Sequence, residues 1–112
     1  MLFETGQRAL FILLSRMKCS VIKYSNHAIE FMGARGIMEP EAEQVVSSGE
    51  TIAEYPDDKP LPGKLIFAMV NGRPVHVVVA YDAETGTCII ITAYEPDLSK
   101  FESDYKTRKK KP

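Results

Sequence analysis

The chain of 112 residues is predicted to fold as an α+β domain. Two helical patterns occupy residues 26–48, and apolar runs rich in Val and Ile occupy residues 51–94. Asn71-Gly72 separates two of these runs and is a strong hairpin signal. Helices that precede a run of strands are typical of the α+β class.

The first half is predicted to form one strand and two helices. Residues 19–24 form the strand, and Ser25 caps a helix over residues 26–35. The second helix begins at Glu39, has a proline in its first turn and ends at Gly49.

The second half is predicted to form a meander of about four antiparallel strands, followed by a short C-terminal helix. Ser99 and Glu102 have the spacing of a capping box, which favours a helix at that point. The expected strands cover residues 51–55, 65–70, 75–81 and 87–94.

Both faces of this sheet are predicted to be apolar. Pairing across Asn71-Gly72 sets Phe67 opposite His76, so His76, Val78 and Ala80 share one face. Helices cover one face, and we expect a partner, a second copy of the chain or a covering loop on the other. The second face carries Val75, Val77, Val79 and Tyr81.

Residues 17–108 are predicted to form a single α+β domain, with residues 109–112 as a basic tail and residues 1–16 as an N-terminal extension or extra helix. Met17 is an alternative start. The apolar run at 9–14 is too short to span a bilayer and lacks the features of a signal peptide. We therefore expect a cytoplasmic protein without membrane contact.

Charge is unevenly distributed along the chain. Five of the fourteen basic residues lie between Lys106 and Lys111, and the remaining chain carries nine basic against fifteen acidic residues. Residues 36–58 hold seven acidic residues and no basic one. An acidic body is not typical of a nucleic-acid-binding protein, and the basic tail is either a phosphate contact or a solvated end.

Cys19 and Cys88 are far apart in the sequence and form no CxxC motif. This spacing indicates neither a disulfide framework nor a zinc site, and it favours a reducing compartment. The two histidines, even with Asp57 and Asp58, make a poor metal site, so no metal and no cofactor is expected.

Two histidines are candidates for acid–base chemistry. His27 lies in the first helical turn, where the helix dipole favours a neutral ring that acts as a base, binds a metal or simply bonds a carbonyl. His76 lies in an apolar strand, where it is either a hydrogen-bonded core residue or a catalyst. Arg35 at a helix end and Tyr94 at a strand end either line a cleft or are ordinary surface residues.

Six short fragments stand in a distinctive order along the chain. They are Tyr24-Ser25-Asn26-His27-Ala28, Met32 with Arg35-Gly36-Ile37, Tyr55-Pro56-Asp57-Asp58, Pro74-Val75-His76-Val77-Val78, Thr92-Ala93-Tyr94-Glu95-Pro96 and Lys106-Thr107-Arg108. Together they resemble the bacterial and archaeal domain-of-unknown-function family DUF4258, over roughly residues 20–108. The chain differs from the family at Phe31, where an Arg is usual one helical turn after the first His.

The resemblance implies a fold similar to the RelE and ParE toxins of toxin–antitoxin modules. It also implies an antitoxin-like partner protein with a CxxC zinc finger. Such toxins are mostly metal-independent endoribonucleases that cut messenger RNA with the 2′-hydroxyl as nucleophile. Histidines then transfer the proton and arginines hold the scissile phosphate. The implied catalytic residues are His27, His76 and Tyr94, and the implied substrate-binding residues are Arg35, Arg108 and Lys106.

The sequence is therefore consistent with three functions. The first is a toxin that cleaves RNA by metal-independent acid–base chemistry. The second is a non-catalytic module that docks a partner, or a second copy as a homodimer, through its sheet. The third is an enzyme of another class that uses His27 with Asp57 or Asp58.

Overall fold

The computed structural model describes residues 18–110. The predictions for residues 1–16, for Met17 as a start and for residues 111–112 of the basic tail lie outside this part of the chain. Between residues 18 and 110, no helix is long and apolar enough to cross a membrane.

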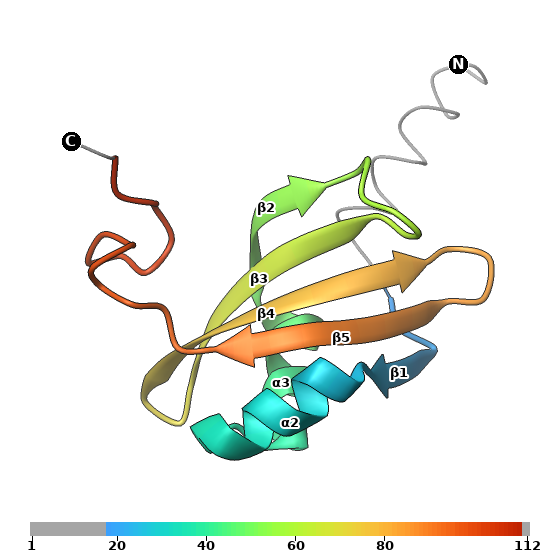
Figure 1. Ribbon diagram of the computed structural model, residues 1–112, viewed down its shortest axis with the longest axis horizontal. Coiled ribbons are helices and arrows are strands. Elements are labelled where there is room, and N and C mark those ends of the chain that lie inside the picture. Colours follow the sequence, from blue (N-terminus) through green and yellow to red (C-terminus); the bar gives the residue numbers. More distant parts are fainter. Residues whose placement is uncertain (1–17, 111–112) are drawn as a thin grey trace.

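The described chain forms two helices on one side of a five-stranded sheet (Figure 1). The predicted α+β class is confirmed. The strand order is β1-β5-β4-β3-β2. The elements are β1 Val21–Tyr24, α2 Asn26–Arg35, α3 Glu39–Ser48, β2 Glu50–Tyr55, β3 Gly63–Val70, β4 Arg73–Asp82 and β5 Thr87–Tyr94.

The sheet is mixed, which differs from the expected antiparallel meander. β2 to β5 do form antiparallel neighbours, but β1 joins as a fifth strand and pairs in parallel with β5. The first residue pair of this ladder is Val21 with Thr87. Two parallel strands need a long connection between them, so β1 and β5 are far apart in the sequence. Their pairing therefore leaves no local signal in the sequence.

Local signals place both helix boundaries correctly. The Ser25 side chain accepts a hydrogen bond from the backbone N–H of Ala28 at 3.0 Å, which begins α2. Gly36 ends α2 with a φ of 67°, a left-handed conformation that glycine adopts without strain. Gly49 follows α3 for a different reason: a Cβ there would lie 2.5 Å from the Val45 carbonyl oxygen.

The hairpin register agrees with its prediction. Asn71 and Gly72 both have positive φ, as a two-residue hairpin turn requires, and Phe67 pairs with His76. The face of β4 that carries Val75, Val77 and Val79 is fully buried against the helices. This contact between sheet and helices is the core of the domain.

The opposite face is covered in part by the chain that follows β5, residues 95–110, which we call the C-terminal segment. Phe101 is 3% exposed, and its ring lies edge-on to His76 at a centroid distance of 4.8 Å. The ring of Tyr105 lies 6.2 Å from that of Phe67. A covering loop, one of the three expectations for this face, is therefore what the described chain provides.

The predicted C-terminal helix is absent from this segment. Asp97, rather than Ser99, accepts the capping bond: its carboxylate receives the backbone N–H of Ser99 at 2.8 Å. The turn does not propagate, because Phe101 pairs instead with Arg108 in an isolated antiparallel bridge. A helix as short as the predicted one is marginal without packing, so this tertiary pairing prevails over it.

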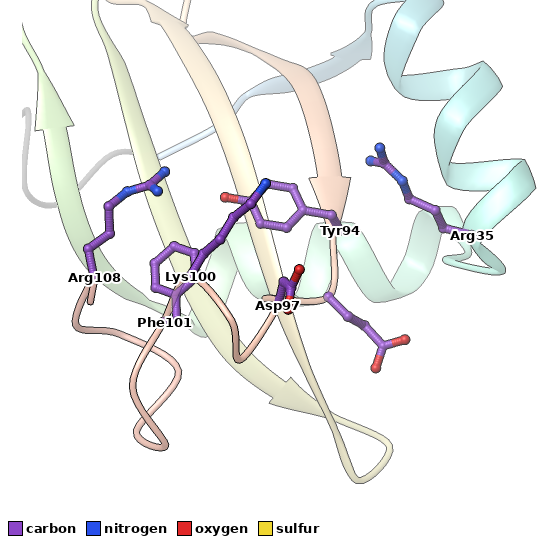
Figure 2. Close-up of a pocket in the computed structure, with 7 residues that line it drawn as sticks. Arg35, Tyr94, Asp97, Lys100, Phe101 and Arg108 are labelled. Atoms are coloured by element: carbon purple, nitrogen blue, oxygen red, sulfur yellow. The ribbon is translucent and has the colours of Figure 1, made fainter. Parts of the chain in front are cut away.

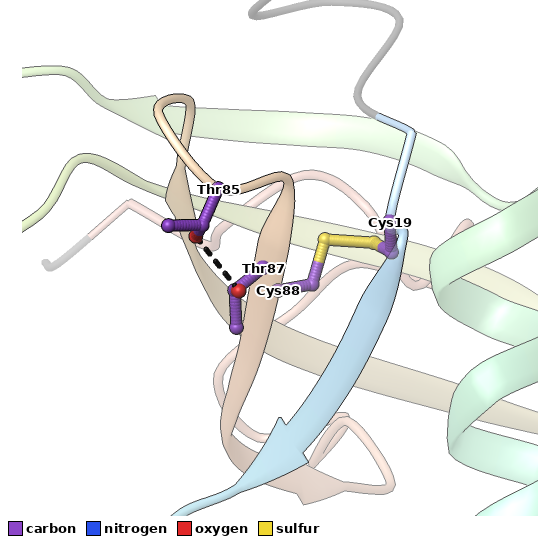
Figure 3. The surroundings of a disulfide bond; sticks show 4 residues. All are labelled: Cys19, Thr85, Thr87 and Cys88. Atoms are coloured by element: carbon purple, nitrogen blue, oxygen red, sulfur yellow. Dashed lines mark hydrogen bonds between the residues drawn. A yellow bond between two sulfur atoms is a disulfide. The ribbon is translucent and has the colours of Figure 1, made fainter.

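Cys19 and Cys88 form a disulfide, which corrects the prediction from their spacing (Figure 3). The parallel pairing of β1 with β5 brings their Cα atoms to 5.4 Å although 69 residues separate them. Disulfides of this kind are rare in reducing compartments. The bond therefore also removes the reason to expect a reducing compartment for this protein.

We predict that reduction of this disulfide lowers the free energy of unfolding by about 4 kcal/mol, the chain-entropy value for a loop of this length. Urea unfolding with and without reductant measures the difference. The double variant Cys19→Ala/Cys88→Ala is the control, because reductant has nothing to cleave in it. A chain that contains two titratable thiols after non-reducing purification would contradict the assignment.

Candidate functional site

A pocket of about 580 Å³ opens where β5 ends and the C-terminal segment begins (Figure 2). Three parts of the chain form its walls: the end of α2, the end of β5 and the C-terminal segment. Figure 2 shows the Tyr94 side chain between those of Arg35 and Arg108. The lining residues are Arg35, Tyr94, Glu95, Asp97, Lys100, Phe101 and Arg108.

Arg35 is held at the pocket by the edge of β5. β1 pairs with only the first four residues of β5, and α2 borders the rest of this edge. The Arg35 guanidinium donates to the Ala93 carbonyl at 2.8 Å and to the Thr92 hydroxyl at 3.4 Å. The guanidinium carbon also lies 4.9 Å from the centroid of the Phe31 ring. The Ala93 carbonyl and the Phe31 ring are both neutral, so these contacts leave the positive charge of Arg35 uncompensated.

Tyr94 is coupled to the buried His76. The Nε2–H of His76 donates to the Tyr105 carbonyl at 2.6 Å, since a carbonyl can only accept. Nδ1 therefore carries the lone pair of the neutral ring and accepts the Tyr94 hydroxyl at 3.4 Å. This tautomer assignment follows from the partners. The side chain has no exposed surface, so His76 is the hydrogen-bonded core residue that the strand pattern allowed.

Burial controls the protonation of this pair. Loss of hydration lowers the pKa of His76 below its ordinary value of 6.5, and the nearby charge of Arg108 lowers it further, against the opposing effect of the Tyr105 carbonyl. Burial also raises the pKa of Tyr94, an effect that the charges of Arg108 and Arg35 oppose. Near neutral pH both groups are therefore uncharged, and the phenol retains its proton.

The C-terminal wall of the pocket is a turn organised by Asp104. Hydrogen bonds from the backbone N–H groups of Thr107 and Lys106 and from the Thr107 hydroxyl hold the pKa of Asp104 at about 2. Tyr105 takes a left-handed φ of 63° inside this turn, which directs its carbonyl to His76. The turn then returns Arg108 to the pocket, with its guanidinium carbon 5.0 Å from the Phe101 ring centroid.

The pocket has more free positive charge than negative charge. Arg35, Lys100 and Arg108 form no salt bridge with any residue between 18 and 110. Asp97 is occupied by hydrogen bonds from Ser99, which lower its pKa, and the Glu95 carboxylate lies 3.7 Å from Arg73. Three cations around a neutral phenol suit an anionic ligand such as a phosphate group.

Two predicted site residues lie elsewhere. His27 is on the exposed surface of α2, on the helix side of the sheet, and stacks on Phe31 at a centroid distance of 4.4 Å. Lys106 points to the Glu50 carboxylate at 3.4 Å. The structure therefore gathers Arg35, Tyr94 and Arg108 around the pocket, with His76 directly behind Tyr94.

Four residues line the pocket but are absent from the sequence-based site: Glu95, Asp97, Lys100 and Phe101. Asp97 follows a proline at the end of a strand, which is a typical position for a turn-forming Asp. That signal identifies the turn, but no local pattern indicates that the turn brings Phe101 back over His76. Among residues 18–110, no three His, Cys, Asp or Glu side chains are close enough together to hold a metal ion.

The family model described as domain of unknown function DUF4258 matches residues 24–95, which is more than half of the chain. The chain belongs to this family. No curated protein and no solved structure matches the chain. The DUF4258 match includes Arg35, His76 and Tyr94, whereas the wall formed by Phe101 and Arg108 follows it.

We predict that the stability of the DUF4258 domain falls as the pH decreases from 7 to 5. Because the pKa of His76 is lower in the folded state, the unfolded chain binds the proton more readily, and stability is lost below the unfolded value. A single titrating group can contribute a slope of at most about 1.4 kcal/mol per pH unit. Urea unfolding at pH 5, 6 and 7 measures it.

His76→Gln is the matched variant, because its amide can still donate to the Tyr105 carbonyl but does not titrate. It should show a flatter dependence over the same range. The same slope in both proteins would mean that His76 does not cause the loss.

Proposed function

We propose that this domain is the toxin of a toxin–antitoxin module and cleaves messenger RNA without a metal ion. The observation that supports this function best is the pocket itself, where three cations that form no salt bridge within residues 18–110 surround a phenol that is hydrogen-bonded to a neutral imidazole. The family resemblance, which implies a fold similar to the RelE and ParE toxins, is the second support for this function. On this proposal, the partner is an antitoxin-like protein with a CxxC zinc finger.

Phosphate binding is the first step. Arg35 and Arg108 lie on either side of Tyr94, so on this proposal they bind the phosphate backbone of an RNA strand that crosses the pocket, and Lys100 adds a third charge. Positive groups in this position stabilise the charge that develops on the phosphoryl oxygens during cleavage. The acidic body of the protein does not oppose this step locally, since Asp97 is engaged in its own turn.

Proton transfer is the second step. The ribose 2′-oxygen attacks phosphorus and forms the 2′,3′-cyclic phosphate, while the bond from phosphorus to the 5′-oxygen breaks. Glu95, whose side chain is half exposed, takes the 2′-hydroxyl proton, and Tyr94 gives its proton to the departing 5′-oxygen. His76 acts through Tyr94: it accepts the phenolic O–H in the free protein and so holds the phenol oxygen at the pocket, and the hydroxyl turns from His76 to the 5′-oxygen when it gives up its proton. His27 has no part in this pocket.

We expect the wild-type chain, expressed from a tightly repressed promoter, to stop growth and to fragment messenger RNA. Tyr94→Phe removes the proton donor and Arg108→Ala removes a phosphate ligand, so each should reduce RNA cleavage about 100-fold. Cleavage of a labelled RNA oligonucleotide by the purified proteins measures both effects. A ribose 2′-deoxy substitution at the cut site should abolish cleavage.

Lys18→Ala is the control, because it removes an exposed cation from the other end of β5. It should cleave RNA like the wild type. Unchanged growth and intact RNA with the wild-type chain would refute the nuclease function, and equal losses in Arg108→Ala and Lys18→Ala would show that only overall charge matters.

A second candidate function is docking of a partner, or of a second copy, through the sheet. The observation that favours it is Met69, which lies on the face away from the helices and is 50% exposed beside the half-buried Phe67. The C-terminal segment covers the His76 region of this face but leaves Met69 open. An apolar side chain at such a position often marks an interface.

We predict that, if the sheet docks a second copy, Met69→Lys converts a dimer to a monomer in light scattering coupled to size-exclusion chromatography. The lysine adds a charge at the centre of the contact, which is costly to bury. Leu98→Lys, at an exposed leucine of the C-terminal segment, is the control and should not change the mass. A wild-type monomer that copurifies with no partner would remove this function.

A further inference from the structure

A second pocket, of about 430 Å³, lies on the helix side of the sheet and shares no residue with the first. It is a groove between α2 and the start of α3, with Tyr24 of β1 at one side. We call it the helix groove. Its principal lining residues are Tyr24, Ile29, Met32, Gly33, Ile37 and Met38.

The helix groove presents apolar side chains to solvent. Met32 and Ile37 are buried and form the floor, but Ile29 is 58% exposed and Met38 is 67% exposed. Both are among the most exposed large apolar side chains of the described residues. Two such side chains on the rim of one groove are typical of a docking site rather than of isolated surface residues.

Gly33 keeps the groove open at its centre. A glycine inside a helix is less stable than alanine by about 1 kcal/mol, and Gly33 has ordinary helical geometry. A Cβ at this position would meet no heavy atom within 4 Å, so packing inside the domain does not require the glycine. A side chain from another molecule has room at this point.

The charge around the groove is acidic. Glu39 lines it, and Glu43 accepts a hydrogen bond from the Tyr24 hydroxyl. Glu30 is exposed one helical turn before Gly33. The nearby cation Arg73 is already paired with Glu41. A ligand that places positive charge beside an apolar side chain therefore complements this surface.

We propose that the helix groove binds a basic segment of a partner protein that inserts an aliphatic or aromatic side chain above Gly33. Lys or Arg residues of the segment contact Glu30, Glu39 and Glu43, as in complexes where an amphipathic helix occupies a groove. The chain's own basic tail does not fit this description, because residues 106–111 contain no large apolar side chain. The proposal is independent of the RNA-binding pocket.

A library of random twelve-residue peptides displayed on phage tests the proposal with the full-length protein as target. Selected peptides should share one large apolar residue flanked by at least two Lys or Arg residues. Their affinity, measured by fluorescence anisotropy of the synthetic peptides, should fall at least tenfold in Gly33→Leu, whose side chain fills the groove. Raising the salt concentration from 50 to 500 mM should weaken binding as well.

Ala34→Leu is the matched control, because it adds the same side chain at the next residue, which is exposed and outside the groove. Both leucine variants favour the helix, so both should fold, and Ala34→Leu should bind the peptides like the wild type. Selected peptides that are acidic, or that bind Gly33→Leu as tightly as the wild type, would overturn the proposal. So would a wild-type dimer that Gly33→Leu makes monomeric, since the occupant would then be a second copy.

Discussion

The candidate site depends on the two hydrogen bonds of one buried imidazole. His76 has no access to water, so both of its nitrogens need partners inside the protein. One partner is the phenol at the floor of the pocket and the other is the Tyr105 carbonyl in the C-terminal segment. The same side chain therefore holds the Tyr94 phenol in place and also holds the wall that carries Arg108. Loss of either bond would leave a buried polar atom unsatisfied, which costs more than the bond itself contributes.

The two surfaces of the domain have opposite charge. The pocket beyond β5 carries Arg35, Lys100 and Arg108, whereas the helix groove has Glu39 and Glu43 at its border. The near-neutral net charge of −1 conceals this separation. An acidic body disfavours nucleic acid as a ligand on average, but binding depends on the local field, and short-range charges dominate at physiological salt.

Features set by neighbouring residues were predictable. Ser25 and Gly36 identify the ends of α2, and Asn71-Gly72 fixes the hairpin register and hence which residues share a face. The strand over residues 19–24 was predicted, but its parallel pairing with β5 and the disulfide were not predictable, because both depend on contacts between residues about seventy positions apart. The candidate site was predictable only in part for the same reason. Arg35, Tyr94 and Arg108 do converge on one pocket. The sheet separates His27 from His76, however, and the apolar pattern within a single helix or strand cannot show on which side of the sheet a helix packs.

The link between Cys19 and Cys88 has a topological consequence. It closes a covalent ring that contains both helices and the four strands β1 to β4, while most of β5 and the whole C-terminal segment lie outside it. A backbone cut in the loop between β2 and β3 leaves the two pieces joined. A cut after β5 releases the segment that carries Phe101 and Arg108, and with it half of the pocket. The helix groove thus belongs to the part of the molecule that one backbone cut cannot separate, whereas the cationic pocket spans both parts and can lose its C-terminal wall.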